Sequence, residues 1–273
     1  MRMYHKFVPP KRMTLPNGKI VTEKRSPAPL IILLVVIGII LSVRFTEFDI
    51  QVLLNHWDKF FDIVRWMIPP DWGFFTELWR PLADTIKMSL LGSILGSAAA
   101  LPVAYAAASN MIRSRIMISL VKVFLSILRT LPTLVTALIA TFIFGLGTTA
   151  GTVAIFLFTL AYVGKLLYEQ IENADMDAFE AMESAGLKRI EAFRYAIMPQ
   201  VLPVYLSTAL FCFEGNVRYA AILGYVGAGG IGFLLQESLG WRDYSAVGMI
   251  LFMLIVTVFL IESISEYFRK RLT

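Results

Sequence analysis

The sequence predicts an all-α membrane protein with about six transmembrane helices and with both ends on the cytoplasmic side. Of its 273 residues, 57% are hydrophobic and 16% are charged, whereas a soluble domain carries about 25% charged residues. The mean hydropathy is +0.69, and the apolar residues form long runs rather than an amphipathic pattern. The Lys and Arg residues concentrate in alternate connections between these runs. These three observations place the core of the protein in lipid.

Six apolar windows are each long enough to cross about 30 Å of hydrocarbon as a helix. They cover residues 27–43, 85–108, 116–146, 149–167, 201–226 and 245–264. With the amino end inside, the cytoplasmic segments hold fifteen Lys and Arg residues and the outer segments hold five. This positive-inside bias predicts that the tails 1–26 and 266–273 are cytoplasmic. The net charge of +5 therefore reflects topology, and no basic stripe with interleaved aromatics points to nucleic acid.

The first window follows a basic tail, as the apolar region of a signal peptide does. The tail is long and no small-x-small cleavage site follows Val43, so we expect a retained span. Within 27–82, the stretch from Ile50 to Ile68 is apolar at helical spacing and charged on its other face. This pattern predicts an interfacial outer helix between spans 1 and 2, ended by Pro69-Pro70.

The connection 169–199 is the longest inner one and carries seven acidic residues, so it must be solvated. Asp177 can cap a helix over residues 178–185, Gly186 can end it in a left-handed conformation, and residues 190–196 can begin a second short helix. We expect a helical hairpin across the membrane surface that fits a groove on a partner. The side chains expected to anchor it are Leu187, Ile190 and Phe193.

One stretch of this connection carries a family resemblance. It reads Glu180-Ala181-Met182, three residues, Gly186, nine residues, then Ala196-Ile197-Met198-Pro199. The stretch resembles the EAA loop of permease subunits in ABC importers, E-A-A-x3-G-x9-I-x-L-P, with departures at Met182, Ala196 and Met198. The resemblance implies that the hairpin couples the chain to a cytoplasmic ATPase. The coupling residues, with the anchors included, are Glu180, Ala181, Gly186, Leu187, Ile190, Phe193 and Pro199.

A run of glycines ends the fifth window. By letters the run satisfies G-x-G-x-x-G, but the strand, the helix and the later acid that a dinucleotide site needs are not convincing here. Glycines at the end of a span let backbones approach closely or let the helix unwind beside a cavity. The residues expected to form a gate or a close-packed contact are Gly224, Gly227, Gly229, Gly230 and Gly232.

Charged residues in the third and fifth windows are candidates for a solute path. Glu214 and Arg218 stand at i and i+4, where they form a structural ion pair or line a solute path. Arg129 lacks an acidic residue four positions away, and we assign it to the path, where a cation would meet an anionic solute. The predicted translocation path consists of Arg129, Glu214, Asn216 and Arg218.

Further motifs sharpen the resemblance. Residues 213–218, F-E-G-N-V-R, and 223–232, L-G-Y-V-G-A-G-G-I-G, are similar to the phosphonate-import permease family, as are residues 164–172 and 144–147. The resemblance begins near residue 83 and implies a permease core over 83–265 with the type I ABC importer transmembrane fold. It implies a bacterial inner membrane location, a homodimer of permease chains, and two ATPase chains that bind ATP and Mg. It also implies an external binding protein that delivers phosphonate, phosphite or a phosphate ester.

Three other classes have weaker support. A methionine-import permease shares the glycine run but not F-E-x-N-V-R. A secondary transporter driven by an ion gradient needs intramembrane acids and ideally inverted repeats, and Glu214 is the main deep candidate. A membrane enzyme needs a nucleophile with its base, paired carboxylates or a metal cluster, and Cys212, His5 and His56 provide none of these. The chain itself is therefore expected to hold no cofactor, no metal and no catalytic residue.

Overall fold

The computed structural model describes residues 11–14, 18, 20–23 and 28–272. The rest of the predicted tail 1–26, and the last residue of the predicted tail 266–273, lie outside the described residues. The chain divides into two compact units, Met1–Phe61 and Asp62–Thr273. The predicted all-α class holds throughout residues 28–272.

The first unit contains one feature that the sequence did not predict. Strands β1 (Lys11–Thr14) and β2 (Ile20–Glu23) form an antiparallel hairpin in which Lys11 pairs with Glu23. The first span is helix α2 (Ala28–Phe45). The predicted outer helix is two helices, α3 (Ile50–Asn55) and α4 (Trp57–Trp66), and the boundary between the two units falls within the second of these.

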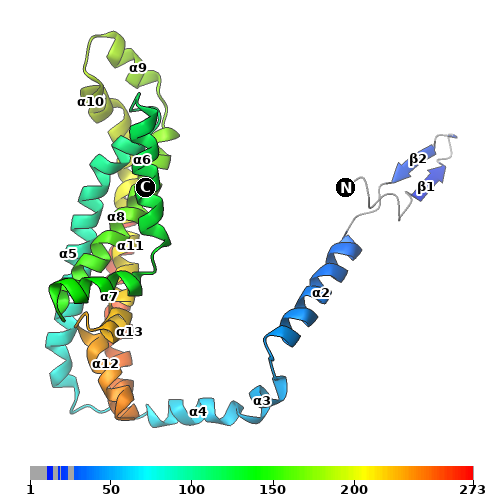
Figure 1. Cartoon of the computed structure of the whole chain (residues 1–273), viewed down its shortest axis with the longest axis vertical. Coiled ribbons are helices and arrows are strands. Elements are labelled where there is room, and N and C mark those ends of the chain that lie inside the picture. Colours follow the sequence, from blue (N-terminus) through cyan, green and yellow to red (C-terminus); the bar gives the residue numbers. More distant parts are fainter. Residues whose placement is uncertain (1–10, 15–17, 19, 24–27, 273) are drawn as a thin grey trace. The chain divides into compact units, whose positions relative to one another are not determined.

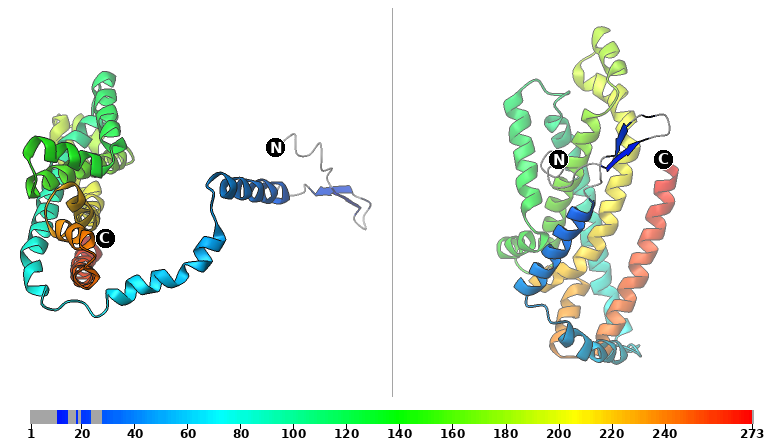
Figure 2. Two further views of the ribbon diagram at one scale, coloured as in Figure 1. Left: turned by 60° about the horizontal axis from the view of Figure 1, so that its bottom comes forward. Right: turned by 90° about the vertical axis from the view of Figure 1, so that its right-hand side faces the viewer.

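The second unit is a bundle of long helices (Figure 1). Its helices are α5 (Phe75–Ala107), α6 (Arg115–Thr130), α7 (Thr133–Phe144), α8 (Thr148–Glu172), α9 (Asp177–Ser184), α10 (Arg189–Ala192), α11 (Met198–Leu223), α12 (Ile231–Gly240) and α13 (Tyr244–Leu272). A π-helical turn η1 (Phe193–Ile197) precedes α11, and a 3-10 turn η2 (Gly224–Val226) follows it. Helices α9 and α10 lie at one end of the bundle and α12 at the other (Figures 1 and 2).

Five helices are long and apolar enough to cross a membrane, and α6 with α7 is a sixth candidate if this bent pair counts as one span. The predicted continuous window 116–146 is wrong, because α6 and α7 meet at an angle of 93°. The break falls at Leu131-Pro132, where Leu131 is extended with ψ 121°. Proline disfavours the helical conformation of the residue before it and cannot donate a backbone hydrogen bond, so the chain turns there.

Small residues set the distance between the two central helices, α5 and α8. A Cβ atom built on Gly92 would lie 2.7 Å from Ile155 Cγ2, and one built on Gly96 would lie 2.7 Å from Thr159 Cβ. Glycines four positions apart therefore present a flat face of α5 to α8, which is how membrane helices pack closely. A separate apolar cluster that includes Leu78 joins α5 to α13.

The acidic connection folds into a hairpin, with two corrections. Gly186 has φ +93° and ends α9 as predicted. The carboxylate that accepts the backbone N–H of Asp177 belongs to Asp175, so Asp177 itself is not the cap. The second short helix does not lie across the surface, because α10, η1 and α11 form one helical segment, Arg189–Val226. Pro199 falls in the first turn of α11, directly after the π-helical turn η1.

Candidate functional site

The hairpin of α9 and α10 has its own small core. Phe179, on α9, is 1% exposed and belongs to a cluster with Met111, Ala192 and Ile197. These three partners come from the α5–α6 connection, from α10 and from η1. An aromatic side chain buried in this way fixes the hairpin against the end of the bundle.

Arg189 ties the hairpin to the α5–α6 connection by hydrogen bonds. Its Nε donates to the carbonyl oxygen of Met111 at 3.1 Å, and its Nη2 donates to that of Asn110 at 2.8 Å. Its Nη1 lies 3.4 Å from a carboxylate oxygen of Glu183 on α9, and its guanidinium lies over the Phe179 ring. Sequence analysis missed this role, because nothing local to Arg189 indicates that its partners lie nearly eighty positions away.

Further hydrogen bonds connect the end of α8 and the start of α11 to the hairpin and to the α5–α6 connection. The side chain of Gln200, on α11, accepts from the backbone N–H of Asp175 and donates to its carbonyl oxygen, both at 3.0 Å. Asn110 donates to the carbonyl oxygen of Ile171 at 2.7 Å. The carboxylate of Glu172 accepts from the backbone N–H of Ser109 at 2.8 Å. The hairpin, the end of α8, the start of α11 and the α5–α6 connection therefore form one cross-linked cap.

The predicted coupling residues lie mostly on the outside of this cap. Six are exposed, namely Glu180, Ala181, Gly186, Leu187, Ile190 and Pro199. Phe193 is different, because it is half-buried and its ring packs edge-on against Tyr105 at 4.9 Å. Phe193 therefore anchors the hairpin to α5 of the same chain and not to a partner. Leu187 is 36% exposed and Ile190 is 56% exposed, and these apolar surfaces suit contact with another protein.

Two of the predicted glycines make a backbone contact that no other residue would permit. A Cβ built on Gly232 would lie 1.9 Å from the carbonyl oxygen of Ala221, and one built on Gly224 would lie 2.2 Å from the carbonyl carbon of Gly232. Helix α12 therefore lies directly against the end of α11. Because only hydrogen occupies this contact, a methyl group at either position would separate the two backbones.

The other three predicted glycines shape the turn between η2 and α12. Gly227, Gly229 and Gly230 have φ between +73° and +79°, a region that side chains rarely adopt. The carbonyl oxygen of Gly227 accepts from the N–H of Gly147 at 2.9 Å, which joins this turn to the start of α8. Thr85 Oγ1, on α5, accepts from the N–H of Ile231 at 2.8 Å and caps α12. The turn is thus fastened to α5 and α8.

The charged residues of the fifth span form a network with α13. Glu214 is 4% exposed and pairs with Arg218 one turn later, while its second carboxylate oxygen lies 3.6 Å from Nη2 of Arg269. Arg218 also lies 3.7 Å from a carboxylate oxygen of Glu262. The charge of this buried carboxylate is therefore balanced within the protein by two guanidinium groups. A solute could reach Arg218, whose side chain is 53% exposed, but not Glu214.

Asn216 lies inside the bundle. Its side-chain amide donates to Ser93 Oγ on α5 and to Thr159 Oγ1 on α8, both at 2.8 Å, and the residue is 1% exposed. In this conformation it joins three helices and does not line an open space. The sequence places Asn216 within the fifth span, but it does not indicate that its two hydrogen-bond partners lie on α5 and α8.

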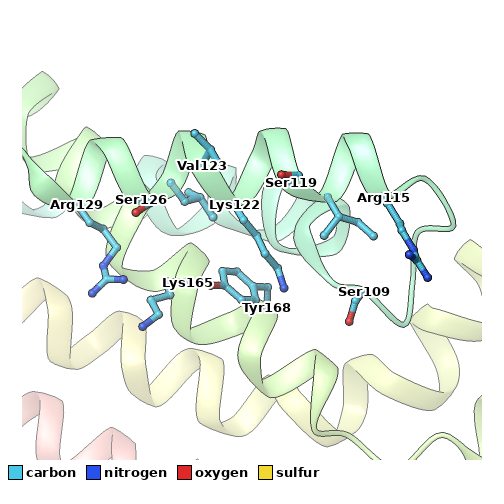
Figure 3. A pocket seen from close by; sticks show the side chains of 11 residues that line it. Ser109, Arg115, Ser119, Lys122, Val123, Ser126, Arg129, Lys165 and Tyr168 are labelled. Carbon is cyan, nitrogen blue, oxygen red and sulfur yellow. The ribbon is translucent and has the colours of Figure 1, made fainter.

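Arg129 lies apart from these residues, near the end of α6. Its side chain is exposed and lines a groove between α6 and α8 (Figure 3). The structure therefore does not bring the four predicted path residues together. Arg218 and Glu214 form one group, Asn216 is buried beside them, and Arg129 faces a separate groove.

Comparisons with known proteins give a consistent result. Residues 81–273 match the family described as binding-protein-dependent transport system inner membrane component. The phosphite transport system permease protein PtxC of Stutzerimonas stutzeri is 33% identical over 222 residues, which are 81% of this chain and 81% of that protein. The phosphate-import permease protein PhnE of Mycolicibacterium smegmatis is 30% identical over 207 residues, which are 76% of this chain and 39% of that protein.

A solved structure shares the fold. One structure of the inward-facing MetNI methionine ABC transporter is similar with a TM-score of 0.65 at 21% identity, over 74% of this chain and 99% of that chain. With the family match, this likeness confirms the predicted fold class for the bundle.

Proposed function

This chain belongs to the family of inner membrane components of binding-protein-dependent transport systems, the permease subunits of ABC importers, and from this premise we propose that it carries phosphorus oxyanions across the membrane. The single observation that carries the substrate class is the likeness, at 30% identity or more, to permeases named for phosphite and phosphate. A methionine permease is less well supported, since the MetNI likeness at 21% identity speaks for the fold alone.

The mechanism follows from the cross-linked cap. We propose that two cytoplasmic ATPase chains, with ATP and Mg bound to them, bind the exposed side of the hairpin around Glu180, Leu187 and Ile190. Because Arg189 joins the hairpin to the α5–α6 connection and Gln200 joins it to α11, displacement of the hairpin moves several helices together. Nucleotide and loaded binding protein would then bias one equilibrium between inward-open and outward-open states.

Two further parts of the proposal concern assembly and orientation. The chain is a multi-pass membrane protein, and we infer that it works as a homodimer whose two copies enclose the path, with lipid around them. We infer from the positive-inside bias that both ends and the hairpin face the cytoplasm of a bacterial cell. An external binding protein would deliver the solute from the opposite side.

A secondary transporter driven by an ion gradient is less well supported by the site. Such a mechanism needs an intramembrane acid that can exchange protons or ions. Glu214 is the deep candidate, and it is already held between Arg218 and Arg269. The proposed importer needs no titrating acid in this chain.

The test is uptake by a reconstituted system of this chain, its ATPase and its binding protein in proteoliposomes. We expect ATP-dependent uptake of phosphite, a phosphonate or a phosphate ester, and no uptake of methionine. Uptake that persists without ATP but collapses with the proton gradient would refute the proposed energy source. Uptake of methionine alone would refute the substrate class.

A pair of variants tests the coupling role of the hairpin. Glu180→Gln combined with Gly186→Ala changes two motif positions that have no neighbouring side chain to disturb, since a Cβ on Gly186 meets nothing within 4 Å. Strain at φ +93° should alter the bend, and the ATPase should copurify poorly. The matched control is Glu237→Gln with Gly145→Ala, because Gly145 also has a positive φ of +82° and open space around its Cβ, and both residues lie outside the hairpin. Wild-type copurification and uptake in the motif variant would contradict the coupling assignment.

A further inference from the structure

The groove between α6 and α8 has a volume of about 670 Å³ and an unusual lining (Figure 3). Four of its residues are basic, namely Arg115, Lys122 and Arg129 on α6 and Lys165 on α8. They are spread along the groove, with Arg115 near Ser109 at one end and Arg129 near Lys165 at the other (Figure 3). Hydroxyl groups of Ser119 and Ser126 line the groove between the three basic residues of α6. The lining thus combines cations with neutral hydrogen-bond donors.

The spacing of these residues along α6 explains why they share one face. Arg115, Lys122 and Arg129 recur every seven residues, which returns to nearly the same side of a helix and advances about 10 Å each time. The opposite face is apolar and open, with Ile116 75% exposed and Leu120 64% exposed. A helix with this division turns its apolar face to lipid and its basic face away from lipid.

The charges in the groove do not balance. Lys122 lies 2.8 Å from a carboxylate oxygen of Glu172, and Lys165 lies 3.2 Å from one of Glu169. Arg115 and Arg129 form no ion pair with any acidic residue in the part of the chain that the structure describes. One unpaired positive charge therefore remains at each end of the groove, and the two lie about 20 Å apart along α6. Each belongs to a guanidinium that can bind an oxyanion through two parallel hydrogen bonds.

We propose that the Arg129 end of this groove binds the tetrahedral oxyanion of a phosphate or phosphonate group. Such a group carries one to two negative charges near neutral pH, and Arg129 and Lys165 are the cations at this end of the groove. Arg129 supplies paired donors and Ser126 supplies a neutral one. The same chemistry is present in a free solute and in the headgroup of an anionic lipid. That a solute of this class enters the groove during transport rests on the proposed function, whereas the anion site rests on the groove alone.

The test measures binding directly, without transport. The full-length chain is placed in phosphatidylcholine nanodiscs, and radiolabelled inorganic phosphate is the probe in equilibrium dialysis. Arg129→Gln should weaken phosphate binding at least about tenfold, because its paired charge-assisted contact is lost. Arg129→Lys keeps the charge and should retain most of the binding. The matched control is Arg115→Gln, which removes the other unpaired arginine of the same helix and should bind phosphate like the wild type.

A second arm separates the two sources of the group. If the natural occupant is a lipid headgroup, nanodiscs that contain phosphatidylglycerol should block phosphate binding, and native mass spectrometry should show a retained lipid that the Arg129→Gln variant lacks. If the occupant is a solute, phosphate should bind equally in both lipids. Failure of the wild type to bind either probe, or equal binding by the Arg129→Gln variant and the control, would overturn the site. Absence of ATP-driven uptake with phosphate binding intact would refute the proposed function and leave the site standing.

Discussion

Replacing Arg189 by glutamine should loosen the hairpin from the rest of the bundle. The guanidinium donates to two backbone carbonyl oxygens, those of Asn110 and Met111, at 2.8 and 3.1 Å. Hydrogen bonds from a charged donor contribute about 1.5–3 kcal/mol each. The side chain is 31% exposed, so water competes and the lower end applies. A glutamine amide is shorter and uncharged and can replace at most one of the two bonds.

Two weaker contacts are lost at the same time. The ion pair with Glu183 is partly exposed and contributes about 0.5 kcal/mol. The guanidinium lies 5.4 Å from the centre of the Phe179 ring, which contributes about 0.5–1 kcal/mol. These contacts share one side chain and do not add fully, so we expect a loss of about 3 kcal/mol in the free energy of local opening. At 1.4 kcal/mol per factor of ten, this corresponds to about a hundredfold.

The measurement is hydrogen exchange of the backbone amides in α9 and α10 of the purified chain. Arg189→Gln should speed exchange there by about a hundredfold and leave α5 and α8 unchanged. The control is Arg194→Gln, whose guanidinium lies 5.8 Å from the centre of the Tyr195 ring and makes no ion pair in the described part of the chain. Exchange in Arg189→Gln within threefold of the control would refute the anchoring role. Faster exchange with an unchanged number of solute molecules transported per ATP would refute the proposal that the hairpin transmits motion from the ATPase to the helices.

Three further predictions concern other parts of the chain. Gly232→Ala should lower the thermal stability of the purified protein by many degrees or prevent its folding, whereas Gly215→Ala, with open space around its Cβ, should not; equal melting temperatures would contradict the close contact of α11 and α12. Asn216→Leu should destabilise the protein by about 2–4 kcal/mol, because two buried hydroxyls lose their partner, and a midpoint of denaturation like that of the wild type would contradict this. Glu180→Cys should react with a membrane-impermeant maleimide in inside-out vesicles only, against a low background because Cys212 is buried; labelling of intact cells would reverse the proposed orientation.

Much of the local structure could be predicted from the sequence. Apolar windows predicted the spans because a helix satisfies its own backbone polar groups, so the side chains of the window decide whether the segment is stable in lipid. Gly186 predicted the bend of the hairpin, since a left-handed residue after a helix favours glycine wherever the helix lies. The window 116–146 was predicted wrongly as one helix, although Pro132 was present as the signal for its break.

The candidate site was predicted less completely, because its contacts join distant segments. Arg129 was recognised as an unpaired cation, but its relation to Arg115 and Lys122 was overlooked, even though their seven-residue spacing is visible along the chain. The contribution of Lys165 could not be predicted in this way, since it depends on how α8 packs against α6. Arg189 gave no local signal either, as its hydrogen-bond partners lie in another connection.

Taken by itself, the sequence determined that this chain spans a membrane repeatedly, that one acidic connection forms a bent hairpin, and which family its motifs resemble. These properties follow from composition, turn chemistry and spacing within short stretches. Only the tertiary structure decided three further properties. Asn216 is buried and bonds to two other helices, Gly224 and Gly232 are in backbone contact, and the basic residues of α6 line a groove. The physical reason is that helix packing is fixed by side chains that are far apart in sequence, so a residue's exposure and partners depend on neighbours that the local pattern does not contain.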